Sequence, residues 1–299
     1  MTVVENTDYP FALCLTHDVD RPYKTYQSLF YAVTERAPSH LLDLLPGRNP
    51  YWQFETITDL EADLGVRSAF YFLSEPPVWN HSPTDLLDFD ALVQALGRYD
   101  VRDPELATVL RRLEGDGWEV GLHGSFHTPD DRERLQREKS RIESVVDGEI
   151  RGGRQHYLNL EIPDTWRHHE AIGLEYDASL GSRTECGFQF GYDVVRPFDD
   201  EFVVFPLTLM EQHLPDPGEE FARAWAVCES LLDTAAAERA VMTALFHPRY
   251  FCDRDFPGYR RLYRQLVEGA LERGAWVGSP GQFYEEFLVD ERQSVAERA

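Results

Sequence analysis

Lysine is nearly absent from this chain of 299 residues: only Lys24 and Lys139 occur among its 29 basic residues, against 53 acidic ones. The formal charge of −24 gives a surface that repels phosphate backbones and anionic lipid headgroups. We therefore expect neither a nucleic-acid partner nor binding to a membrane surface. An acidic excess with so little lysine favours a protein adapted to high salt, where screening relieves self-repulsion. The alternative is an ordinary acidic protein from a GC-rich genome.

Cysteine is scarce and long apolar runs are missing. The four cysteines lie far apart without a Cys-x-x-Cys pair, which argues against a zinc ribbon and against a disulfide framework. The longest apolar run, near residues 202–210, is too short to span a bilayer. Residues 1–10 are acidic and contain no apolar stretch, so we expect no signal peptide. These features predict a cytoplasmic protein without a transmembrane segment, and they leave its oligomeric state open.

The chain does contain enough hydrophobic residues, 42% of the total, to bury a large core. Strand-like and helix-like segments alternate along it. Strands are expected at 11–16, 66–73, 118–122, 150–158, 174–177, 202–207, 240–246 and 275–277. Helices are expected at 24–36, 53–64, 103–116, 130–146, 163–172, 219–237, 259–273 and 281–289. Roughly seven or eight such units predict an α/β fold, a closed or nearly closed parallel barrel. No linker divides the chain, so we expect a single domain over 1–299, with its core at about 10–290 and an inserted loop region at 74–101.

In parallel barrels the chemistry lies at the carboxyl ends of the strands, and the first strand ends in Thr16-His17-Asp18-Val19-Asp20. Side chains alternate along an extended chain, so Asp18 and Asp20 point to one side and His17 to the other. Two carboxylates on one face repel each other unless a cation or a shared proton relieves them. The plainer interpretation is a turn or a helix cap.

Two further clusters follow later strands. His123 and His127 are four residues apart and meet on one face if the segment turns helically, which suits an ion of the zinc type. Such a pair also arises by chance. Arg154 follows Gly152 and Gly153, which permit a close approach of the backbone, and its planar fork could fix a carboxylate. The alternative is a surface arginine beside a turn.

Two more polar residues emerge from strand ends. His247 closes an apolar strand and is a candidate general acid, or else a satisfied core histidine. Asp177 offers another carboxylate, or else caps a helix or turn. Together, one aspartate and two histidines would make a metal site of three ligands with positions left for water and substrate, which is a catalytic pattern.

The ordered motifs THDVD, HGSFH, GRQHY, YDASL and LFH resemble those of the polysaccharide deacetylases, carbohydrate esterase family 4, over about residues 11–248. The resemblance implies a distorted (β/α)7-type barrel and metal-dependent removal of N-acetyl groups from a sugar or oligosaccharide. It also implies individual roles: Asp18 as general base, Asp20, His123 and His127 as metal ligands, Arg154 orienting the base, the Tyr157 backbone N–H binding the oxyanion, and His247 as general acid. Asp177 resembles a later acidic motif and would tune His247 or shape the substrate pocket.

The sequence departs from the family at two places. Val19 separates carboxylates that are adjacent in the commonest form, so swapped or shared roles for Asp18 and Asp20 stay open. Gln155 and His156 replace the usual prolines and would reshape the sugar site.

One divalent ion is expected, with Zn²⁺ as the first choice, although the same ligands accept other first-row metals. Because no secretion signal is expected, a lipid-linked or nucleotide-linked N-acetylated saccharide suits the protein better than an extracellular polymer.

Three other functions remain open. The same site could hydrolyse another linear or cyclic amide, as allantoinase-like relatives do. The protein could instead be a non-catalytic glycan-binding protein on this scaffold, although the presence of Asp18 and His247 argues for catalysis. An iron oxygenase with two histidines and one carboxylate is the third, but its usual His-x-Asp start is missing.

Overall fold

The computed structural model describes residues 2–34, 36, 38–45, 47–74, 98–198 and 201–289. The inserted region expected at 74–101 therefore lies mostly outside the described residues. Within them, no helix is both long enough and apolar enough to cross a membrane.

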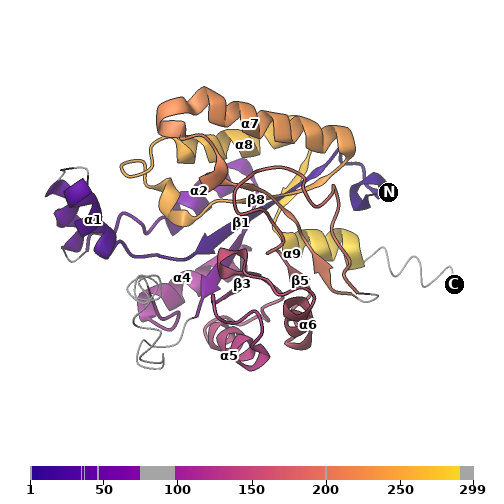
Figure 1. Ribbon diagram of the computed structural model, residues 1–299, viewed down its shortest axis with the longest axis horizontal. Coiled ribbons are helices and arrows are strands. Elements are labelled where there is room, and N and C mark those ends of the chain that lie inside the picture. The colour runs from indigo at the N-terminus through magenta and orange to yellow at the C-terminus, as the bar shows by residue number, and fades with distance from the viewer. Residues whose placement is uncertain are drawn as a thin grey trace.

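A curled parallel sheet forms the centre of the molecule, with β1 (Ala12–Val19) in its middle (Figure 1). The other strands are β2 (Ala69–Leu73), β3 (Glu119–Gly124), β4 (Gly152–Gln155), β5 (Tyr176–Asp177), β6 (Val203–Val204), β7 (Leu207–Met210), β8 (Val241–Leu245) and β9 (Trp276–Gly278). Their order is β6-β5-β4-β3-β2-β1-β8-β7. The carboxyl half of β1 pairs with β2 and its amino half with β9, while β8 pairs along its other edge. The carboxyl ends of all these strands therefore share one end of the sheet.

Helices surround this sheet. They are α1 (Tyr26–Thr34), α2 (Phe54–Leu64), α4 (Pro104–Gly115), α5 (Arg132–Glu143), α6 (Asp164–Ala171), α7 (Pro217–Glu238), α8 (Tyr259–Glu272) and α9 (Pro280–Phe283). Figure 1 shows α7 and α8 on one side of the sheet, α4, α5 and α6 on the opposite side, and α1 projecting away. Leu207, at the start of β7, lies beside the segment that follows β5, and its N–H donates to the Leu180 carbonyl at 2.8 Å. The sheet thus curls into a half-barrel, and the expected single-domain α/β barrel fold is confirmed.

The boundaries differ from the sequence expectation mainly between 202 and 210. One strand was expected at 202–207, but the structure contains the short strands β6 and β7 instead. Pro206 lies between them, and a proline cannot donate a backbone hydrogen bond to a sheet. By contrast, α4 begins as expected, with Asp103 at the N-cap and Pro104 in the first turn.

The two faces of β1 have different surroundings. Leu13, Leu15 and Val19 belong to the large apolar cluster shared with the covering helices. Ala12 and Cys14 belong to a second cluster inside the curl. The alternation continues through the polar end of the strand, so Asp18 lies on the inner side with Ala12 and Cys14. His17 points outward, as expected, and its Nε2 lies 3.0 Å from the carboxylate of Glu61.

Glu61 on α2 is a fully buried carboxylate that joins α2 to β1, to α8 and to the residues just before β2 and β3. Its oxygens accept hydrogen bonds from the side chains of Ser68 at 2.9 Å, Trp118 at 2.6 Å and Tyr263 at 2.5 Å, in addition to the contact with His17. Such a group is costly to remove because buried donors, those of Ser68 and Trp118 among them, lose their acceptor.

We therefore expect Glu61→Ala to lower the free energy of unfolding by about 3–5 kcal/mol. Urea denaturation followed by circular dichroism measures it. The matched control is Glu55→Ala in the first turn of α2, where the carboxylate is half exposed, and we expect a change of about 0.5 kcal/mol or less there. Equal effects at the two positions would contradict the role given to Glu61.

Candidate metal centre and catalytic pocket

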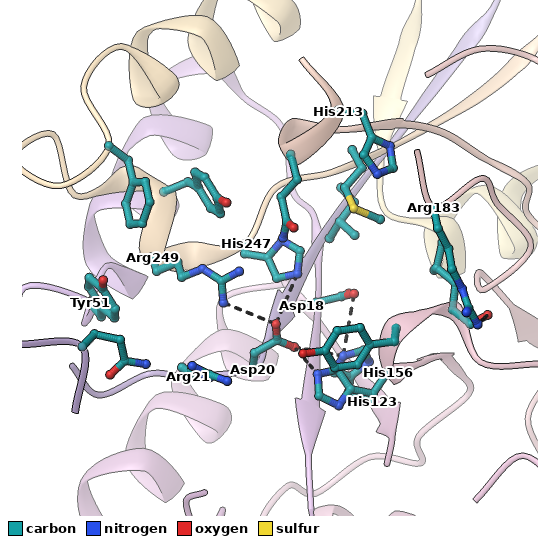
Figure 2. A pocket seen from close by; sticks show the side chains of 18 residues that line it. Asp18, Asp20, Arg21, Tyr51, His123, His156, Arg183, His213, His247 and Arg249 are labelled. Atoms are coloured by element: carbon teal, nitrogen blue, oxygen red, sulfur yellow. Dashed lines mark hydrogen bonds and ion pairs between the residues drawn. The ribbon is translucent and has the colours of Figure 1, made fainter. Parts of the chain in front are cut away.

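A pocket of about 370 Å³ opens at the carboxyl ends of β1, β3, β4, β7 and β8 (Figure 2). A cavity of this size suits a small-molecule substrate. The residues that line it are Asp18, Asp20, Arg21, Gln27, Tyr51, His123, His156, Tyr157, Leu158, Arg183, Met210, Gln212, His213, Leu245, His247, Arg249, Tyr250 and Phe256. The polar ends of several strands therefore converge on one space, as expected for a barrel.

Asp20, His123 and His156 form a candidate metal centre in this pocket. Each offers a ligand atom, and these atoms lie within 4.8 Å of one another. The Nε2 atoms of His123 and His156 lie 3.1 Å and 3.5 Å from Oδ1 of Asp20. Asp20 follows β1, His123 is the next-to-last residue of β3, and His156 follows β4 directly. The carboxyl ends of β1, β3 and β4, with β2 between β1 and β3, thus deliver one oxygen and two nitrogen donors.

The two imidazoles differ in protonation: burial would lower the pKa of His123, but the carboxylates of Asp18 and Asp20 outweigh it and raise that pKa, so a bound cation would take the place of a proton there. Nδ1 of His123 donates to the Arg154 carbonyl at 2.8 Å, so a neutral His123 ring directs an Nε2 lone pair towards Asp20. Burial lowers the pKa of His156 to about 4, so this ring is neutral at pH 7 and also carries a lone pair. A backbone carbonyl that fixes the far nitrogen is the usual support for a histidine ligand. The donor set fits a zinc-type ion with positions left for water and substrate.

His127 is not part of this group, which differs from the expectation drawn from the motif. Its side chain is exposed and packs against the ring of Phe126. The expectation required a helical turn after His123, but the strand continues through Gly124. The backbone N–H and hydroxyl of Ser125 then bond to the buried carboxylate of Glu138 at 3.0 and 2.6 Å, which fixes the loop in this path. His156 supplies the second imidazole instead.

Asp18 lies beside the metal centre and is held by Arg154. Nη1 of Arg154 donates to Oδ1 of Asp18 at 2.8 Å, and the same nitrogen contacts the Thr16 hydroxyl at 2.9 Å. Nε of Arg154 donates to the Ala178 carbonyl at 2.7 Å. Burial alone would raise the pKa of Asp18, but the Arg154 guanidinium and His123 hold it below its usual value. The carboxylate is therefore ionised, with its Oδ2 3.8 Å from Nε2 of His123.

His247 closes the other side of the pocket and is held by Glu211. Its Nδ1 lies 2.7 Å from Oε1 of Glu211, and its Nε2 lies 3.3 Å from Oδ2 of Asp20. Burial would lower the pKa of His247, but the carboxylates of Glu211 and Asp20 outweigh it and raise that pKa to about 10. Sequence reasoning missed Glu211. The available signal was its position directly after an apolar strand, but β7 was not recognised as a separate strand.

The other two expected residues lie in different surroundings. Tyr157 lines the pocket with a half-exposed side chain, and its backbone is left-handed with φ 58°, which is uncommon for a bulky residue. Asp177 is fully buried away from the pocket lining, where it accepts from Trp166 at 3.1 Å and from the Ser179 hydroxyl at 2.5 Å. The structure therefore gives Asp177 no contact with substrate space or with His247, and Glu211 lies where that partner was expected.

Comparisons with known proteins support the fold. Neither a protein-family model nor a curated protein matches the sequence. A structure from Mycobacterium smegmatis, provisionally assigned as a polysaccharide deacetylase, is 15% identical with a TM-score of 0.62, covering 96% of this chain and 93% of that one. A GH57-type branching enzyme from Pyrococcus horikoshii is 11% identical with a TM-score of 0.52, covering 93% of this chain and 71% of that one. At such identities the likeness concerns the fold alone.

Proposed function

We propose that this protein is a metal-dependent hydrolase that removes N-acetyl groups from a sugar or oligosaccharide. The observation that carries the proposal is the meeting of three metal-ligand candidates, a carboxylate held by an arginine and a histidine held by a glutamate in one pocket. The deacetylase-type fold and the ordered sequence motifs agree with it. The finer assignments below are proposals of the same kind.

The donor set of Asp20, His123 and His156 would hold the ion, with Zn²⁺ as the first choice. Such an ion, when bound, supplies a Lewis acid and an activated water. Amide hydrolysis then needs a base for the proton of the water and an acid for the leaving amine.

Asp18 is the base in this proposal. It is ionised, its Oδ1 is fixed by Arg154, and its Oδ2 faces the metal centre. Arg154 acts as a positioning residue, since it touches Asp18 rather than the substrate. The fully buried guanidinium also bonds to Thr16 and Ala178. These two contacts fix its position, and Arg154 in turn fixes the position of the Asp18 carboxylate.

His247 is the acid. The carboxylate of Glu211 orients its ring and stabilises the protonated form, so a proton on Nε2 is available to the sugar nitrogen as it departs. Tyr157 lines the same pocket, and its backbone N–H is the proposed partner of the oxyanion.

The two candidate histidine ligands can be separated by paired variants. His156→Ala should lose most of its bound zinc and at least about 100-fold in acetate release, because it removes a direct donor. His127→Ala should keep the metal and the rate of the unmodified protein, since its side chain is exposed. Metal content by mass spectrometry, measured beside the rate, decides between them. Loss of zinc in His127→Ala alone would overturn the ligand set proposed here.

Glu211→Gln tests the acid. The change keeps a hydrogen-bond acceptor beside Nδ1 of His247 but removes the charge, so we expect kcat to fall by about 10–100-fold with metal content unchanged. Steady-state acetate release gives kcat. Glu219→Gln, on the exposed first turn of α7, is the matched control. A kcat equal to that of the control would remove Glu211 from the catalytic arrangement.

The function itself is tested with defined N-acetylated saccharides at high salt, following acetate with and without a chelator. Lipid-linked and nucleotide-linked saccharides belong in the panel beside chitin oligomers. The proposal expects acetate release that the chelator abolishes and Zn²⁺ restores. Hydrolysis of cyclic ureides without acetate release would favour the allantoinase-like alternative. Saccharide binding without turnover, in protein shown to contain metal, would favour a glycan-binding protein.

A further inference from the structure

Two arginines that sequence reasoning did not single out, Arg21 and Arg249, lie on the wall of the pocket beside the metal centre. Figure 2 shows them on the same side of Asp20, with Tyr51 beyond them. Nη1 of Arg249 lies 3.5 Å from Oδ2 of Asp20, and its guanidinium lies over the ring of Tyr250 at 5.2 Å. Both side chains therefore bring a permanent positive charge to the substrate space.

The charge balance of the lining contrasts with the rest of the molecule. The whole chain carries a formal charge of −24, yet the pocket wall contains three arginines, Arg183 being the third, and two aspartates. Asp18 is already neutralised by Arg154, which lies behind it. Of the two lining aspartates, Asp20 is therefore the one that balances the other positive charges. It lies near Arg21, Arg249 and His247. The pocket is cationic before any metal binds.

A bound divalent ion makes this imbalance larger. The charge of Asp20 is then shared with the cation, and Arg249, whose side chain is about four-fifths buried at 20% exposure, loses much of its attraction to that carboxylate. A charged group this far from water needs another counter-charge. An anionic group of the substrate in the pocket, whose wall also contains Arg21, would supply that charge beside Arg249.

We propose that Arg21 and Arg249 bind an oxyanion of the substrate, so that the substrate is an N-acetylated sugar bearing a phosphate or a carboxylate close to the amide. This assignment of the substrate class rests on the proposed function. The planar guanidinium fork matches both anions in a bidentate manner. The geometry also separates the two ends of the substrate: the amide meets Asp18 and His247 at the metal centre, and the anion lies on the side of Arg21 and Tyr51 (Figure 2).

A binding measurement tests the anion site without any turnover. Inorganic phosphate is titrated calorimetrically into the zinc-loaded protein, into Arg21→Gln and Arg249→Gln, and into the control Arg261→Gln, whose arginine lies over Phe221 away from this pocket. We expect the Kd for phosphate to rise about 10-fold or more in each pocket variant and to stay constant in the control. Metal content is measured in every sample, so that phosphate bound to zinc contributes equally. Absence of phosphate binding in the unmodified protein, or unchanged Kd in both pocket variants, would overturn the assignment.

Matched substrates then identify the anion. The panel contains a neutral N-acetylated oligosaccharide, an N-acetylated sugar phosphate and an N-acetylated uronate. The proposal expects kcat/KM at least about 10-fold higher for one of the charged substrates, with that advantage lost in Arg21→Gln and Arg249→Gln and partly restored in Arg249→Lys. Equal kcat/KM for neutral and charged substrates would refute the anion site while leaving the deacetylase proposal intact. Phosphate binding that depends on the arginines, without acetate release from any substrate, would refute the deacetylase proposal while leaving the anion site intact.

Discussion

Replacing Asp20 by alanine is expected to abolish metal binding and acetate release together. Asp20 is the hub of the pocket: its carboxylate lies 3.1 Å from His123, 3.3 Å from His247 and 3.5 Å from both His156 and Arg249. The variant removes the anionic donor among the three proposed ligands and leaves cationic and neutral groups facing one another. We expect kcat/KM to fall on the order of 10³-fold or more, since the Lewis-acid contribution of a metal is several kcal/mol.

Metal content and rate must be measured on the same sample for this test. Asp233→Ala is the matched control, because Asp233 is exposed and pairs with Arg273 at the surface. An Asp20→Ala protein with full metal content and full rate would refute the ligand assignment. A protein that loses the metal but keeps the rate would show instead that the reaction does not depend on this centre.

The parts of the site that the sequence predicted are those set by the alternation of side chains along a strand. Asp18 and Asp20 were expected on one side of β1 and His17 on the other, and the structure places Asp18 and Asp20 in the pocket and His17 against Glu61. The two-residue period is fixed by backbone geometry. The side on which each side chain lies can therefore be predicted without knowing the neighbouring elements. His123 and Arg154 were found for a related reason, since both lie near the carboxyl ends of strands that the sequence analysis expected.

The residues that the sequence did not reveal depend on loops. The expectation for His127 assumed a helical turn that the loop after β3 does not make, because Ser125 is tied to Glu138 on α5. His156 enters the centre through a backbone turn in which Tyr157 adopts a left-handed conformation. That conformation comes from tertiary packing rather than from local preference. Arg21 and Arg249 carry no sequence signal at all in a chain rich in arginine; only the shape of the pocket assembles them.

Changing Asp18 to asparagine should separate catalysis from metal binding. The side chain keeps its size and its hydrogen bond to Arg154 through the amide oxygen, but it can no longer accept a proton. We expect normal zinc content and a kcat lower by about 10²–10⁴-fold, the range for loss of a general base. This pattern differs from that of Asp20→Ala, where metal and rate fall together.

The stability of Asp18→Asn has to be followed, because Arg154 then remains charged and fully buried without its anionic partner. Breaking such a pair costs about 3–5 kcal/mol of folding free energy, so thermal denaturation is recorded beside the kinetics. The double variant Asp18→Asn/Arg154→Gln removes the unpaired charge and is expected to regain stability without regaining rate. Recovery of the rate in the double variant would mean that the loss came from unfolding, and a single variant with full kcat and bound zinc would rule out Asp18 as the base. A stable, zinc-loaded and slow double variant would instead assign the lost activity to the missing carboxylate.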